Sequence, residues 1–292
     1  MLEYHPIDAE QLAHFDQQGY LVVRNALDSN TISTLIEASD RLIASDRQVN
    51  RQRTANGLYD GFRNSVTLDD AYLPLMTHPT ILPIVVQLLG ANLHLMTSHL
   101  IYKHPDPAGT PSTHRTPGWH RDYAQAMHDL GHYSIPRIEL KCAYYFTDLS
   151  EPNSGATLVS PGSNHLQAPI QIPAGQVDPA NTVEPLLNPG DCLIFENRTW
   201  HAGATNLSGW IRKGIMIGYG YRWVMPMDFR KQDAAFVERL TPLQRYLVGE
   251  QWDDEVNFQP NGGANPLKAW CQANGLPVAR HFGPQQAITN IL

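Results

Sequence analysis

The feature that most constrains the fold is a series of short strand-like segments that begins at about residue 93. Each segment is apolar or alternates apolar with polar residues, and Gly, Pro, Asn and Asp separate it from the next. Such spacing is typical of an antiparallel barrel or jelly roll, because a parallel sheet would need a helix between consecutive strands. The predicted strands cover residues 93–103, 138–147, 156–159, 182–186, 191–195, 199–205 and 213–223. We therefore expect a mainly β fold.

Helical patterns lie on both sides of this β region. Residues 8–45 indicate a helix, a short strand at 19–23 and a second helix whose apolar residues recur at helical spacing. Another helix is expected over 80–89, and two short ones over 234–237 and 243–247. These helices are expected to flank a double-stranded β-helix core.

The chain contains no repeat and no clean linker, so we expect a single domain over residues 1–292. It would comprise a helical N-terminal flank at about 1–92, a β core at about 93–224, and a helical C-terminal flank and tail at about 225–292. Residues 46–69 are polar and without clear periodicity, which predicts a long loop. Such a loop could close over a site as a lid.

Charge and composition argue against several classes of protein. The 292 residues include 21 Lys and Arg against 28 Asp and Glu, giving a net charge of −7 without a basic block. Neither nucleic acid nor an anionic membrane surface is therefore an expected partner. No apolar run approaches the roughly 20 residues of a membrane-spanning helix, and the first six residues do not resemble a leader, so we expect a cytoplasmic protein. Cys142, Cys192 and Cys271 lack paired spacing and are expected to be buried, reduced thiols.

A His-x-Asp pair is the strongest chemical signal. His120 and Asp122 are two residues apart, so in extended backbone their side chains point to the same face and can converge on one ion. A lone pair of this kind is weak evidence, and a third ligand must come from elsewhere. His201 follows a strong strand signal and is the best candidate. Two imidazoles and one carboxylate form the facial triad of non-haem Fe(II) oxygenases, which leaves coordination positions open.

A cation is then expected where a chelating keto acid would need one. Between His201 and Arg212 lies the turn-rich segment 206–209, which predicts a hairpin in which these two residues face each other across an antiparallel pair. The planar guanidinium of Arg212 could hold a distal carboxylate with two hydrogen bonds.

At this point the sequence resembles a known family, the phytanoyl-CoA dioxygenase-like branch of the Fe(II)/2-oxoglutarate dioxygenases. The resemblance extends over roughly residues 8–250, and its specificity lies in the order of several motifs. The matching pieces are residues 15–23, 119–122, 147–148, 153–165 and 189–191, followed by His201 and Arg212.

The resemblance implies a double-stranded β-helix that binds Fe(II) through His120, Asp122 and His201 and uses 2-oxoglutarate and O2. Arg212 would anchor 2-oxoglutarate, and Lys103 corresponds to a family position that can assist co-substrate or substrate binding. Family members that halogenate generally lack the carboxylate ligand. Asp122 therefore favours hydroxylation or another oxidation over halogenation. The expected reaction is oxidation of a substrate, most simply hydroxylation, coupled to conversion of 2-oxoglutarate to succinate and CO2.

The residues leave other functions open. The same iron chemistry can end in desaturation, epoxidation, cyclisation or endoperoxide formation. A non-catalytic jelly-roll module could use the pocket for a small ligand, and a cupin-like isomerase or hydrolase would need no keto acid. The expected partner is a small-molecule substrate, and a positive rim of Arg115, Arg121 and Arg137 would favour an anionic one. Neither the substrate's identity nor the oligomeric state is indicated by the sequence.

Overall fold

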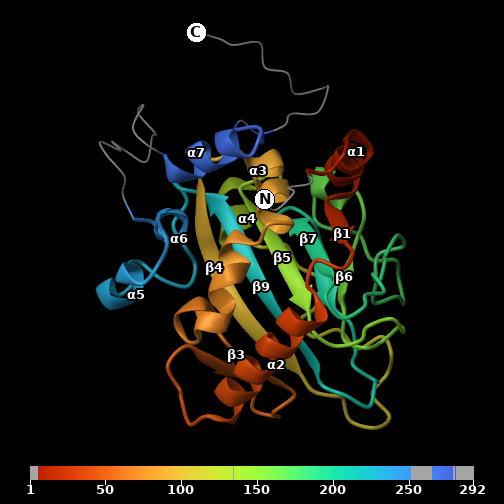
Figure 1. Cartoon of the computed structure of the whole chain (residues 1–292). Helices are drawn as coiled ribbons and strands as arrows, with labels where there is room; N and C mark the ends of the chain where they lie inside the picture. The colour runs from red at the N-terminus through yellow and green to blue at the C-terminus, as the bar shows by residue number, and fades with distance from the viewer. Residues whose placement is uncertain (1–5, 134, 251–264, 279, 281–292) are drawn as a thin grey trace.

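A seven-stranded antiparallel sheet forms the centre of the protein (Figure 1). The computed structural model describes residues 6–133, 135–250, 265–278 and 280. From one edge to the other the strands are β1 (Tyr20–Val23), β7 (Cys192–Glu196), β5 (Glu139–Tyr145), β9 (Arg212–Tyr221), β4 (Leu93–Lys103), β3 (Tyr59–Phe62) and β2 (Arg51–Arg53). The long central strands β4 and β9 are paired along most of their length.

A smaller sheet completes the jelly roll. Strands β6 (Thr157–Val159) and β8 (His201–Gly203) pair with each other, and isolated bridges extend this sheet from Val159 to Val183 and from His201 to His120. The mainly β architecture expected from the spacing of the strand signals is confirmed.

Alternation along the strands separates the helical face of the large sheet from its inner face. On β5, the side chains of Leu140, Cys142 and Tyr144 join the core that packs against helices, while those of Ala143 and Tyr145 join a separate cluster on the opposite side. Residues two apart lie on the same face of a strand. The inner face therefore receives the odd-numbered residues of β5, and this is the face that carries the site described below.

Helices flank the sheet and bury its outer face. Helix α3 is apolar except for Gln87 and entirely buried, and it contacts β5 and β9. Helix α1 begins with a capping box formed by Asp8 and Gln11, as its sequence indicates. The helices are α1 (Ala9–Gln18), α2 (Ser29–Ala44), η1 (Ser65–Thr67), η2 (Asp70–Thr77), α3 (Ile81–Leu89), α4 (Ala124–Leu130), η3 (Ser163–His165), α5 (Ala234–Glu238), α6 (Pro242–Leu247) and α7 (Pro266–Ala273).

Membrane-spanning length is not reached by any single helix in the described part of the chain. Among the described helices, only η2 and α3 taken together are long and apolar enough to span a membrane, and their axes are bent by 48° relative to each other.

Three local predictions need correction. Residues 46–69 are not a long loop, because β2 and β3 form a hairpin that adds two edge strands to the large sheet. Residues 182–186 do not form a strand and contribute one bridge through Val183. Helices α4 and α7 were not predicted. Part of the predicted C-terminal tail, residues 251–264 and 281–292, lies outside the described residues, as do residues 1–5.

Burial of His94 leads to a prediction about pH. Its side chain lies inside the fold, with ring nitrogen Nε2 2.8 Å from the carbonyl oxygen of Val224. Burial lowers the pKa of His94 to about 4, although the hydrogen bond to Val224 favours the charged ring. The unfolded chain therefore takes up this proton first, so the contribution of His94 to stability is complete above pH ~6.5 and is lost as the pH falls towards 4.

We expect His94→Gln to reduce the loss of unfolding free energy between pH 7 and pH 5, measured by urea denaturation. The control is His128→Gln, which removes an imidazole that is 82% exposed and should leave the difference unchanged. An identical pH dependence in wild type and His94→Gln would show that His94 is not a source of it.

Candidate metal centre

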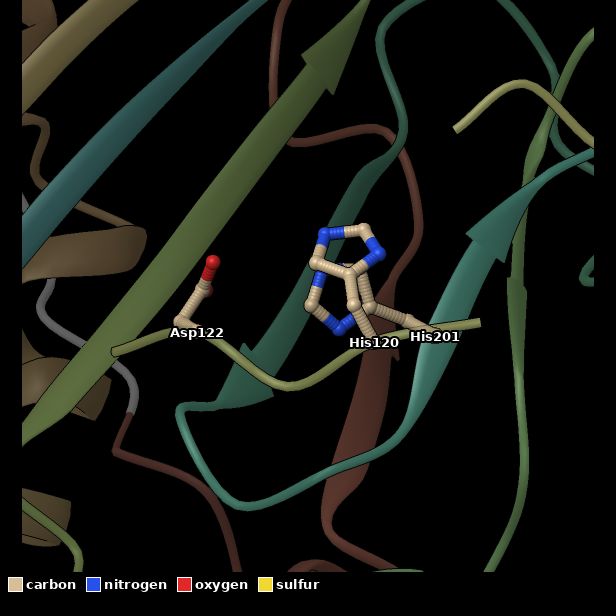
Figure 2. Close-up of side chains that lie close together, drawn as sticks. All are labelled: His120, Asp122 and His201. Atoms are coloured by element: carbon tan, nitrogen blue, oxygen red, sulfur yellow. The ribbon is translucent and has the colours of Figure 1, made fainter. Parts of the chain in front are cut away.

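The backbone brings the His-x-Asp segment and His201 together. The amide of His120 donates to the carbonyl of His201, and the amide of His201 donates to the carbonyl of His120, each at 2.9 Å. This reciprocal pair places the two histidines directly opposite each other. Asp122 follows two residues after His120. Its side chain reaches the same place, as the spacing predicts (Figure 2).

The three side chains present their ligand atoms to one point. One ligand atom from each of His120, Asp122 and His201 lies within 4.8 Å of the others, and the ring centroids are 4.2 Å apart. Nδ1 of His120 lies 2.8 Å from the carbonyl oxygen of Gly118, and Nδ1 of His201 lies 2.9 Å from that of Thr199. A neutral imidazole that donates from Nδ1 has its lone pair on Nε2. Both rings can therefore offer Nε2 to a metal ion.

The charges at this point also fit a divalent cation. Burial raises the pKa of Asp122, but the positive charge of Lys141 and the two imidazoles outweigh it and hold the pKa below its ordinary value. Burial lowers the pKa of His201 to about 4, which keeps the ring neutral. The Oδ2 atom of Asp122 is buried and has no hydrogen-bond partner among the described residues. A buried carboxylate oxygen without a donor is costly, and a bound cation would satisfy it.

Two cations lie at one end of the same cavity. Lys103 and Arg212 are direct partners across β4 and β9, and both side chains are buried. Lys103 donates to the carbonyl oxygens of Thr116 and Ala204, while Nε of Arg212 donates to that of Gly155 at 3.0 Å. Within the described chain, neither cation forms an ion pair with a carboxylate. Two buried positive charges without a counter-ion form a site for an anion.

Comparison with known proteins places this site in a family. The profile of the phytanoyl-CoA dioxygenase family matches residues 15–214, more than half of the chain. The chain belongs to this family. Membership makes the protein an Fe(II)- and 2-oxoglutarate-dependent oxidoreductase, and it confirms the prediction of an enzyme over that of a non-catalytic binding module.

Individual relatives are distant. The chain is 23% identical to dioxygenase andF of Emericella variicolor, with 94% of each chain covered. It is 28% identical to dioxygenase trt7 of Aspergillus terreus over 120 residues, 39% of this chain and 38% of that protein. Among solved structures, the epimerase SnoN in complex with Fe3+, α-ketoglutarate and nogalamycin RO has a TM-score of 0.56 at 20% identity, covering 94% of this chain and 96% of that one. The likeness to SnoN shows a shared fold.

One predicted contact in this phytanoyl-CoA dioxygenase family member is wrong. His201 and Arg212 do not face each other across a hairpin, because β8 and β9 belong to different sheets. His201 lies opposite His120 and Val159, and Arg212 lies opposite Lys103. The turn between them is where the chain crosses from one sheet to the other. Both residues nevertheless line one cavity of about 390 Å³, together with His120 and Asp122.

The three arginines predicted to form a positive rim around the site do not do so. Arg115 forms a two-bond ion pair with Asp178, and Arg121 donates to backbone carbonyls at Ser163 and Leu166. Arg137 is buried between Asp16 and Glu196. None of these three arginines lines the cavity.

Sequence reasoning missed the pair of Glu139 and Lys141 on the inner face of β5. Nζ of Lys141 lies 2.6 Å from Oε1 of Glu139, both side chains are buried, and Lys141 lines the cavity close to Asp122. The available signal was a pair of opposite charges two residues apart in a strand that is otherwise apolar. The two side chains of such a pair lie on the same face of the strand, and their buried charges must be neutralised by each other or by close neighbours.

Proposed function

We propose that this enzyme oxidises a small-molecule substrate, in the simplest case by hydroxylation, at an Fe(II) ion held by His120, Asp122 and His201. The observation that carries the proposal is the convergence of one ligand atom from each of these three residues, with an unpartnered carboxylate oxygen on Asp122, in the cavity that also contains Lys103 and Arg212. When bound, iron with 2-oxoglutarate supplies the activation of O2, coupled to release of succinate and CO2.

The protein's own residues position these groups. The carbonyls of Gly118 and Thr199 orient the two imidazoles so that each presents Nε2, and the positive charge of Lys141 keeps Asp122 ionised. Arg212 would hold the distal carboxylate of 2-oxoglutarate, and Lys103 would add a second positive charge beside it. Burial of both cations excludes water and strengthens their attraction for that carboxylate.

We expect Arg212→Ala to weaken 2-oxoglutarate binding by about 10- to 100-fold, the cost of losing charge-assisted hydrogen bonds in a buried site. The measurement is an anaerobic titration of the apo-protein with Fe(II) and then 2-oxoglutarate, following the visible charge-transfer band of the chelated keto acid. The proposal is supported if the band forms in wild type and if Arg212→Ala needs a higher concentration of 2-oxoglutarate to form it.

The matched control is Lys213→Ala. Lys213 is the next residue on β9, its ammonium group is paired with Asp40, and it does not line the cavity. This variant should bind 2-oxoglutarate as wild type does. Unchanged binding in Arg212→Ala would remove Arg212 from the proposal, and metal binding without a band in wild type would indicate chemistry that uses no keto acid.

A further inference from the structure

The cavity contains more positive charge than its co-substrate needs. Four cationic side chains line it, Arg63, Lys103, Lys141 and Arg212, against the single carboxylate of Asp122. Lys103 and Arg212 form the pair assigned to 2-oxoglutarate. Lys141 is neutralised by Glu139, which lies behind it. Arg63 is the cation that the proposed function leaves unexplained.

Arg63 lies in a turn directly after β3, the second strand of the β2–β3 hairpin. Its amide donates to the carbonyl of Asn50 at 2.8 Å, and the amide of Asn64 donates to Asp228 at 3.0 Å. The guanidinium then reaches the cavity, where Nε donates to Gln52 and Nη1 to Thr97, each at 3.2 Å. These contacts orient the side chain without neutralising it, because both acceptors are uncharged.

The nearest carboxylate satisfies Arg63 only weakly. Asp228 Oδ1 lies 3.7 Å from Nη1, beyond hydrogen-bond distance, while Oδ2 accepts bonds from the amides of Asn64 and Ser98 and from the hydroxyl of Thr97. Within the described chain, Nη2 of Arg63 has no hydrogen-bond partner, and the side chain remains 33% exposed. Arg63 therefore lines the cavity with one donor, Nη2, that the described residues leave available to a ligand.

The balance of charge leaves room for one more anion. The four cations are opposed by Asp122 and by the two carboxylates behind them, Glu139 and Asp228, which leaves one positive charge. A divalent metal ion and a doubly charged 2-oxoglutarate cancel each other. A monoanionic substrate would neutralise the filled site.

Position along the sheet separates Arg63 from the co-substrate pair. Lys103 lies opposite Arg212 at one end of the β4–β9 ladder, and Thr97, which binds Arg63, lies opposite Gly218 further along. Six residues of strand span roughly 20 Å. Apolar side chains of Phe195 and Met216 line the cavity, and the Phe195 ring lies 4.7 Å from that of His201. A ligand held at Arg63 would therefore place an apolar body beside the metal centre.

We propose that Arg63 binds a carboxylate of the substrate, and that the enzyme therefore oxidises a small organic anion with an apolar body. This inference rests on the proposed function, because it assigns the space left beside the metal ion and 2-oxoglutarate. Binding of an anionic substrate, predicted for Arg115, Arg121 and Arg137, is thus assigned to Arg63, on another segment of the chain.

The experiment compares two probes of equal shape, phenylacetate and phenylacetamide. Each is titrated anaerobically into protein saturated with Fe(II) and 2-oxoglutarate, so that the Lys103–Arg212 pair is occupied, and perturbation of the charge-transfer band is followed. Wild type should respond to phenylacetate at a concentration about 10- to 100-fold lower than to phenylacetamide, the range expected for charge-assisted hydrogen bonds. Arg63→Gln should lose this preference, and Arg63→Lys should retain part of it.

The control is Arg53→Gln, which removes a 62% exposed arginine from the same hairpin and should preserve the preference. The band itself shows that each variant is folded and binds 2-oxoglutarate. Equal response to both probes in wild type, no response to either, or a preference that survives in Arg63→Gln would each overturn the inference. Absence of the band in wild type would instead count against the proposed function.

Discussion

Asp122→Ala is expected to abolish 2-oxoglutarate turnover and to weaken metal binding by more than about 100-fold. That figure is the upper end of the cost of losing a group that merely hydrogen-bonds to a metal ligand, so loss of a ligand should exceed it. Asp122 is the only carboxylate among the described residues that line the cavity. Without it, two imidazoles alone would have to hold a divalent ion beside the positive charge of Lys141.

Two measurements test this. Fe(II) affinity is measured by anaerobic calorimetry, and succinate formation is measured in the uncoupled reaction, in which 2-oxoglutarate is turned over without a substrate. Asp129→Ala serves as the control, since it removes a 57% exposed carboxylate seven residues away. The unfolding midpoint of each apo-protein separates loss of the metal site from loss of the fold. Turnover at the wild-type rate in Asp122→Ala would refute the assignment of the metal ligands.

The largest effect on stability is expected at Glu196. Its side chain is fully buried at the end of β7, where it accepts hydrogen bonds from Arg137 and Arg198. Glu196→Gln keeps the shape but removes the charge, and the guanidinium of Arg137, which is 2% exposed, loses its buried partner. Breaking one side of a buried ion pair typically costs about 3–5 kcal/mol. We expect a loss of that size in the free energy of unfolding.

Urea denaturation of the apo-protein tests this expectation. The contrasting variant is Asp70→Asn, which breaks an ion pair with Arg239 whose two side chains are 67% and 50% exposed, and it should change the free energy of unfolding little. Similar, small losses in both variants would mean that Asp16 alone suffices to hold Arg137.

The Glu196 network also bears on the metal centre. Only four residues separate Glu196 from His201, and the carbonyl of Thr199 in this connection accepts the hydrogen bond that orients the His201 ring. The hydroxyl of Thr199 donates to the carbonyl of Gly19 at 2.7 Å. The segment between β7 and β8 is thus anchored to Gly19, which ends α1 and directly precedes β1, so that packing at the sheet edge helps to determine where one proposed ligand lies.

Local sequence determined most of the elements and part of the site. Alternation predicted β4 at residues 93–103 and placed β5, β7 and β9 to within two residues at each end. The two-residue spacing of His120 and Asp122 was enough to put their side chains on one face, because it depends only on the geometry of extended backbone. The hairpin of β2 and β3 was missed because its stability comes from pairing with β4, which no local pattern records.

Tertiary structure decided which of the candidate residues meet. Arg212 shares the cavity with His201 but lies opposite Lys103, since the chain changes sheets between β8 and β9. Arg115 and Arg137 form close ion pairs with carboxylates from distant segments, whereas the ion pair of Arg63 with Asp228 is longer, at 3.7 Å, and Arg63 lines the cavity. The charge of an arginine is evident from sequence, but whether that charge is neutralised depends on long-range packing. Strand pairing and ion pairing are set by contacts between residues far apart in the chain, and those contacts exist only in the folded protein.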